Sequence, residues 1–110
     1  MAGRDLYIIQ SKETGAIKVG RSDNPERRLH QLQTGCPYTL RLILTLKDGG
    51  RHERYVHESM DHLRTRHLNG GEWFLEEALG SVPVQIWEHV HPWYKEDPDW
   101  WKAAKPQGRS

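Results

Sequence analysis

Apolar and polar positions alternate over short stretches in the first half of the chain, which is the pattern of half-buried strands. Residues 17–20 are such a stretch, residues 5–10 are a short apolar run of strand-forming residues, and residues 11–16 between them contain a glycine suited to a turn. We therefore predict an antiparallel hairpin. A third strand is predicted within residues 38–50, because leucines at every second position from 40 to 46 indicate one shared buried face.

Helical signals follow the hairpin. The clearest helix is predicted over residues 22–35, where Asn24 or Asp23 can cap the amino end and Pro25 suits the first helical position. Gly35 can end this helix, because glycine readily adopts the left-handed conformation found after a helix.

A second helix is predicted over residues 51–66 by its apolar stripe, and short helical segments are predicted at 75–79 and 82–90. The stripe consists of Val56, Met60 and Leu63. The order of elements is then β-β-α-β-α with short helices after it. It predicts an α+β fold in which a small three-stranded, mostly antiparallel sheet is flanked by helices.

The length of the chain limits the number of domains, and its charge limits the kind of surface that it can form. A chain of 110 residues is expected to form one domain with one modest core, which we place at residues 1–92. Residues 93–110 form a tryptophan-rich tail whose first half packs on the domain or stacks on bases, and whose distal part from residue 103 is expected to be disordered. Because 16 basic side chains nearly balance 15 acidic ones, a basic surface can arise only by segregation of charge.

Cysteine usage and hydropathy indicate the compartment. The only cysteine, Cys36, excludes an internal disulfide and is interpreted as a small loop residue, since no nucleophile signature surrounds it. No apolar run approaches the length of a membrane span, and residues 1–10 lack a signal-peptide core. We expect a cytoplasmic protein with no membrane contact.

Four residues have chemistry that suits a phosphodiester. Tyr7 and Lys18 lie on neighbouring strands and are expected to face each other if the hairpin loop is centred near residues 12 and 13. An ammonium group beside a phenol favours the phenolate, which is a better base. Arg28, one turn into its helix, offers a planar fork for a phosphate, and the carboxylate of Glu53 can hold one Mg²⁺.

Five short motifs in order resemble the GIY-YIG nuclease superfamily, and most closely its compact phage-type branch. "LYI" contains Tyr7, and "KVG" ends at Gly20, thirteen residues later. Arg28 follows Gly20 by eight residues, "RHERYVHESM" is similar to the acidic helix with Glu53, and "GGEWF" is similar to the closing motif. The resemblance covers residues 5–78 and implies a metal-dependent endonuclease that hydrolyses DNA phosphodiester bonds.

The resemblance also implies residue roles. Tyr7 would act as general base or orient the attacking water, and Lys18 would make Tyr7 a better base by favouring the phenolate. Arg28 would bind the phosphate, and Glu53 would bind Mg²⁺ or Mn²⁺. Three further side chains are candidates for substrate binding: Arg21, His30 and His57. The chain departs from the family pattern at the first glycine, where it has Asp5 or Leu6, and at the second tyrosine, where it has Lys18.

Other interpretations of the same residues stay open. Tyr7 can be a core residue, and Glu53 with His57 can be a solvated pair on one helical face. Glu72 can be a second acidic group of the site or a turn carboxylate. Histidines recur every five residues, which turns them about 140° around a helix, so they cannot converge on one ion. "HERYVH" also misses the H-E-x-x-H spacing, and a zinc protease is not expected.

Two rival functions remain. A nucleic-acid-binding module that has lost catalysis is consistent with Lys18 in the place of a tyrosine. A protein-interaction domain would use the tryptophan-rich tail as its contact surface. For an endonuclease of this size we expect DNA as the substrate, with weak or structure-directed choice of target, or selection through a protein partner or a dimer.

Overall fold

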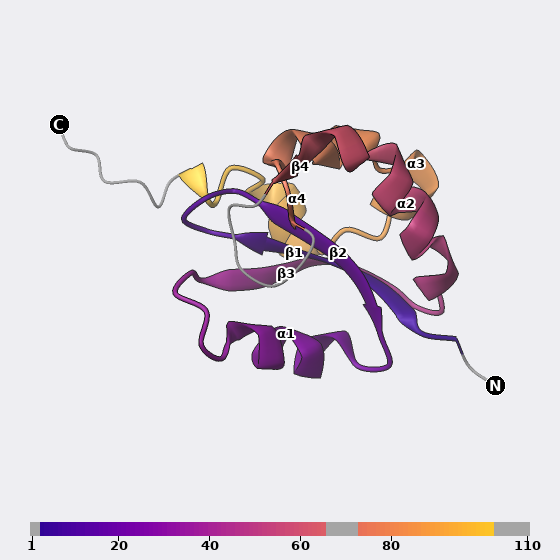
Figure 1. Cartoon of the computed structure of the whole chain (residues 1–110), viewed down its shortest axis with the longest axis horizontal. Coiled ribbons are helices and arrows are strands. Elements are labelled where there is room, and N and C mark those ends of the chain that lie inside the picture. The colour runs from indigo at the N-terminus through magenta and orange to yellow at the C-terminus, as the bar shows by residue number, and fades with distance from the viewer. Residues whose placement is uncertain (1–2, 66–72, 103–110) are drawn as a thin grey trace, which may run out of the picture.

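The computed structural model describes residues 3–65 and 73–102, and Figure 1 shows the arrangement of their elements. The sheet has five strands in the order β3-β1-β2-β5-β4, and every pair is antiparallel. The strands are β1 (Asp5–Ser11), β2 (Ile17–Ser22), β3 (Leu40–Leu46), β4 (Arg64–Thr65) and β5 (Trp73–Phe74). The predicted α+β class is confirmed, and two short strands join the three that were predicted.

Helices cover both faces of the sheet. Figure 1 shows α1 on one face, and α2, α3 and α4 on the other. The α-helices are α1 (Pro25–Gln33), α2 (Glu53–Ser59), α3 (Val84–Trp87) and α4 (Pro92–Glu96). Short 3₁₀ helices are η1 (Gly50–His52), η2 (Asp61–Leu63) and η3 (Glu76–Ser81). Among the helices described, none is both long and apolar enough to cross a bilayer.

The hairpin register differs from the expected one by two residues. Tyr7 pairs with Gly20, and Lys18 pairs with Ile9. The loop is displaced because Gly15, with a φ of 78°, takes the left-handed position of the turn. The prediction that Tyr7 and Lys18 face each other is therefore wrong. They share one face of the hairpin, because Lys18 is two residues from the partner of Tyr7.

A bulge in β3 breaks the leucine alternation. Ile8 pairs with Leu44, but the next residue, Ile9, pairs with Leu42, so Ile43 is an extra residue in β3. Leu42 packs on the α1 side of the sheet, whereas Ile43 and Leu44 belong to the larger core on the opposite side. The prediction of one face shared by all four leucines is wrong for this reason.

The predicted helix over residues 51–66 is only partly present. α2 ends at Ser59, and β4 begins at Arg64. The chain leaves the helical path because its backbone pairs with β5: Leu75 N–H donates to the Leu63 carbonyl at 2.8 Å, and Arg64 lies opposite Phe74. The apolar stripe still packs inward, since Val56 and Met60 are fully buried.

The first part of the tryptophan-rich tail packs on the domain. Tyr94 and Trp100 are buried in the larger core, and Trp100 Nε1 donates to Oε1 of the buried Gln10 at 2.7 Å. The guanidinium of Arg41 lies 3.6 Å from the ring centroid of Trp93. These aromatic side chains are thus used in packing. The division of the chain at residue 92 stays a prediction, and residues 103–110 lie outside the described residues.

The segment before and within α4 also follows the outer strand of the sheet. Val90 forms an antiparallel bridge with Leu44 of β3. The backbone N–H of His91 donates to the Ile43 carbonyl at 2.8 Å, and Trp93 Nε1 donates to the Leu42 carbonyl at 3.2 Å. The bulged part of β3 is therefore hydrogen-bonded on its outer side.

Candidate active site

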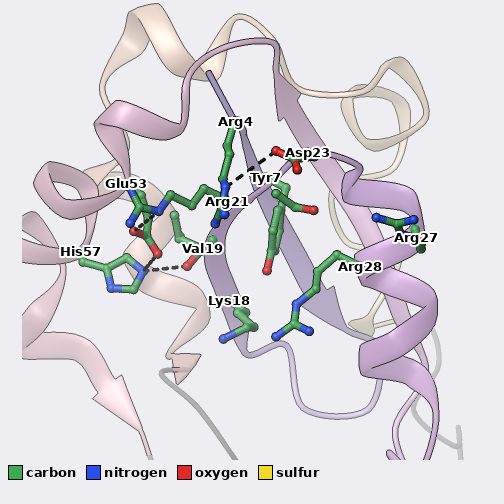
Figure 2. Close-up of a pocket in the computed structure, with 12 residues that line it drawn as sticks. Arg4, Tyr7, Lys18, Val19, Arg21, Asp23, Arg27, Arg28, Glu53 and His57 are labelled. Atoms are coloured by element: carbon green, nitrogen blue, oxygen red, sulfur yellow. Dashed lines mark hydrogen bonds and ion pairs between the residues drawn. The ribbon is translucent and has the colours of Figure 1, made fainter. Parts of the chain in front are cut away.

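A cleft with a volume of about 530 Å³ lies where the β1–β2 hairpin, the first turn of α1 and the start of α2 meet. Figure 2 shows its side chains. Six of the seven predicted site residues line it: Tyr7, Lys18, Arg21, Arg28, Glu53 and His57. Residues far apart in the sequence thus share one concave surface.

The seventh predicted residue, His30, is not brought into the cleft. It is exposed on α1 and does not line the cleft. The reason is helical geometry, because two residues after Arg28 a side chain points about 200° away around the helix axis. The prediction that His30 contacts the substrate is not supported by this placement.

Tyr7 is the buried group of the cleft. Its side chain is 2% exposed and packs in the apolar cluster on the α1 side of the sheet. The ring lies directly over Gly20, where a Cβ atom would be only 2.5 Å from Tyr7 Cζ. Figure 2 shows the hydroxyl directed toward the space between Lys18 and Arg28. Glycine at position 20 therefore creates the room that the tyrosine occupies.

Lys18 is held beside the same space by β2. Its Nζ lies 5.9 Å from the centroid of the Trp73 ring, within the range of a cation–π contact. Glu72, the neighbour of Trp73 that sequence analysis considered as a second acidic group, lies outside the described residues.

The amino end of α1 places two arginines at the mouth of the cleft. Asn24 is the capping residue, since its Oδ1 accepts from the Arg27 backbone N–H at 3.1 Å, and Pro25 occupies the first turn. Arg27 and Arg28 follow in that turn with exposed side chains. Arg28 Nη1 makes a long hydrogen bond of 3.4 Å to Gln31, which is weak enough to give way to a phosphate.

Glu53 faces the cleft from α2 between two basic groups. Its Oε1 lies 3.8 Å from Arg21 Nε, and its Oε2 lies 3.6 Å from His57 Nε2. Both distances exceed those of normal hydrogen bonds, and the Glu53 side chain is 26% exposed. The carboxylate is thus oriented by charge and accessible from the cleft.

His57 ties α2 to β2. Its Nε2 lies 2.6 Å from the carbonyl oxygen of Val19, which can only accept, so this nitrogen carries the proton. The ring also packs edge-on against Phe74, with centroids 5.3 Å apart. Because Val19 lies between Lys18 and Gly20, this contact fixes the Glu53 helix relative to the strand that holds the rest of the site.

The cleft is positively charged although the whole chain is nearly neutral. Two acidic residues, Asp23 and Glu53, line it, against five cationic ones: Arg4, Lys18, Arg21, Arg27 and Arg28. Sequence analysis did not assign Arg4 or Arg27 to the site. Arg4 directly precedes β1, whose first residue pairs with the last residue of β2, and this pairing brings it to the cleft. Its ion pair with Asp23, at 3.7 Å, is exposed and therefore weak.

The acidic groups bear on the kind of metal that the cleft can hold. In the described residues, no three His, Cys, Asp or Glu side chains are grouped as metal ligands. Glu53 offers one accessible carboxylate. That fits Mg²⁺, which keeps several waters and is commonly held by one or two carboxylates together with substrate phosphate. The cleft is therefore compatible with a hydrated divalent ion whose coordination shell is completed by a phosphate of the substrate.

Comparison with known proteins places this geometry in a family. No curated protein and no solved structure matches the chain significantly. The sequence model of one family, described as the T5orf172 domain, matches residues 6–95. This range contains all five strands apart from the first residue of β1, and every cleft residue except Arg4. The chain belongs to the T5orf172 domain family, a phage-associated family related to GIY-YIG-like nuclease folds.

Proposed function

We propose that the protein is a metal-dependent endonuclease of the GIY-YIG type, which hydrolyses DNA phosphodiester bonds in the cleft. One observation carries the proposal: the hydroxyl of a buried tyrosine, arginine guanidinium groups and an accessible carboxylate meet in one positively charged cleft. Membership of a nuclease-related family supports it.

Tyr7 acts on the attacking water. Its ring is immobilised by burial and by Gly20, so its hydroxyl holds one position in the cleft. A positioned oxygen can orient the water and accept its proton. The oxygen that accepts the proton is that of the phenolate, which becomes a neutral phenol, and the ammonium of Lys18, on the same face of the hairpin, stabilises the phenolate charge before the transfer.

The arginines bind and stabilise the phosphate. Arg28 presents a guanidinium beside the Tyr7 hydroxyl, and a guanidinium can bond two phosphate oxygens at once. Arg21 lies beside Glu53, so it can contact the same phosphate or its neighbour along the strand. Donors placed before the reaction are an effective way to stabilise charge that develops in the transition state.

Glu53, on α2, would hold the divalent ion. When bound, Mg²⁺ or Mn²⁺ supplies Lewis-acid stabilisation of the phosphate and of the leaving oxygen. The contact of His57 with Val19 keeps Glu53 in register with Tyr7 and Lys18.

Nicking of supercoiled plasmid with Mg²⁺, with Mn²⁺ and with EDTA tests the proposal. Wild type is run beside Tyr7→Phe and Glu53→Gln. The matched controls are Tyr55→Phe, a tyrosine that is 60% exposed, and Glu58→Gln, an exposed glutamate on the same helix. Metal-dependent nicking that is lost in the two cleft variants and kept in the two controls is the expected result.

Two other results contradict the proposal. Nicking that survives Glu53→Gln means a contaminant or a metal site elsewhere. Salt-sensitive DNA binding without cleavage under any metal identifies the chain as a nucleic-acid-binding module that has lost turnover.

A further inference from the structure

A second pocket shares no lining residue with the cleft. It has a volume of about 370 Å³ and lies where η3, α3 and α4 meet. Tyr94, one of its lining residues, belongs to the core on the α2 side of the sheet, whereas Tyr7 belongs to the cluster on the α1 side. Figure 1 shows α3 and α4 on the face opposite α1. A ligand in this pocket therefore does not compete with DNA in the cleft.

The walls of this pocket are apolar and aromatic. Aliphatic side chains of Leu79, Val82 and Val84 line it, and Val84 is 70% exposed. Trp87 and Tyr94 supply two ring walls, packed edge to face with centroids 5.9 Å apart. Such walls suit an alkyl chain that is held beside aromatic rings.

The rim of the pocket is acidic. Glu76 lines it directly, and Pro98, another lining residue, lies between Asp97 and Asp99. From residue 76 to residue 102 the chain carries six carboxylates and two Lys or Arg residues, Lys95 and Lys102, and Lys102 Nζ lies 3.4 Å from Asp99 Oδ1. The segment that surrounds this pocket thus has an excess of acidic residues, whereas the cleft has an excess of basic ones.

The hydroxyl group of Tyr94 adds a polar feature to the pocket. The Tyr94 side chain is only 4% exposed, and no described residue is hydrogen-bonded to its hydroxyl. Burial, followed by the charges of Glu76 and Asp99, raises the pKa of Tyr94 to about 12. The phenol oxygen therefore stays protonated near carboxylates, in an environment where a cation would relieve the excess negative charge.

We infer that this pocket docks a basic segment of a partner protein by taking up one arginine or lysine side chain. The alkyl stem packs on Val84 and Leu79, and the cationic head reaches the Glu76 carboxylate beside the Trp87 and Tyr94 rings. Charge complementarity selects this occupant, because a nucleic acid is repelled by the acidic rim, and a neutral apolar side chain brings no cation to the Glu76 carboxylate that lines the pocket. The inference does not depend on nuclease activity.

The test uses the full chain labelled with ¹⁵N and the synthetic peptide acetyl-Gly-Leu-Arg-Leu-Gly-amide. We expect saturable shifts of the Trp87 indole and of the Gly80 and Val84 amides at millimolar peptide, with weaker binding at high salt. The same peptide with citrulline in place of arginine keeps the shape and loses the charge, so its affinity should fall several-fold. Glu76→Gln should weaken binding equally, and the adjacent exposed Glu77→Gln should not.

Three results overturn the inference. The first is the absence of saturable shifts with the arginine peptide. The second is equal affinity for the citrulline peptide, which identifies an apolar site. The third is self-association of the protein alone that Val84→Glu abolishes, which makes a second copy the occupant. Plasmid nicking by Glu76→Gln is expected to equal wild type, so failure of this inference and failure of the nuclease proposal can be distinguished.

Discussion

Gly20→Ala is the smallest change that tests how the cleft is built. Gly20 pairs with Tyr7 across the hairpin, and the tyrosine ring lies over it. A Cβ atom at this position would lie 2.5 Å from Cζ and 3.0 Å from Cε1 of Tyr7, whereas ordinary van der Waals contact begins at 3.4 Å. The ring therefore has to move by about 1 Å, because a buried side chain cannot turn freely out of the way.

The energy of this change has two opposing parts. Overpacking a buried site costs about 1–3 kcal/mol. Alanine restricts the unfolded chain more than glycine does, which returns about 0.4–1 kcal/mol. The net loss in the free energy of unfolding is then about 0–2.6 kcal/mol, with about 1.3 kcal/mol from the midpoints of the two ranges, so the variant still folds. Its effect on nicking should be larger, because a displacement of about 1 Å at a reacting group can lower the rate by about 100-fold.

Urea denaturation and plasmid nicking measure the two effects separately. Gly80→Ala is the matched control, since a Cβ atom there meets nothing within 4 Å. It should leave nicking unchanged. In the background Tyr7→Ala, which removes the ring, Gly20→Ala should no longer destabilise the protein, and the coupling energy between the two sites should match the overpacking cost.

A Gly20→Ala variant with wild-type stability and nicking would refute the reasoning. It would mean that the Tyr7 ring does not lie over Gly20 in solution. Equal destabilisation in the presence and absence of the ring would instead place the cost in the backbone of β2.

Three further predictions concern packing, capping and pH. Trp100→Phe removes the donor to the buried Gln10 Oε1 and should lower the free energy of unfolding in urea by about 1–3 kcal/mol; no change would contradict the hydrogen bond. Asn24→Ala should lower thermal stability by about 1 kcal/mol, and Asp23→Ala, beside it but not the cap, should have little effect. Burial raises the pKa of Tyr94 to about 12, above its ordinary value of about 10. The contribution of Tyr94 to the free energy of unfolding is therefore complete below pH 10 and is lost as the pH rises through 12. Tyr94→Phe should flatten this alkaline decline in urea titrations, and an unchanged decline would assign it to other groups.

Local signals in the sequence were sufficient for the hairpin and for α1. The asparagine and proline at the start of α1 act within the same turn of chain, so their effect can be read without knowing the rest of the fold. The register of the hairpin could not be read in this way. It depends on which loop residue takes the left-handed conformation, and that position is occupied by Gly15.

The features that could not be predicted from the sequence depend on contacts between residues far apart in the chain. The bulge at Ile43 is invisible in a run of alternating leucines, because both faces of this sheet are covered and both accept apolar side chains. The end of α2 is set by pairing with β5, and that strand is too short to be recognised from sequence. The spacing of Tyr7, Arg28 and Glu53 was recognisable as a family pattern, whereas Arg4 joins the cleft only through strand pairing.

The hydrogen bonds on the outer side of β3 have a consequence for the solubility of the protein. β3 is an edge strand, and an open edge is a template on which another chain can add a strand and aggregate. The N–H of His91 and the indole of Trp93 occupy the carbonyls of Ile43 and Leu42, and so block that addition at the bulge. A shortened protein that ends before residue 91 would keep every residue of the cleft and lose this protection. The segment that begins at His91 therefore prevents the addition of a further strand to β3 at the bulge. This role is separate from any part that the segment plays in stability or in binding.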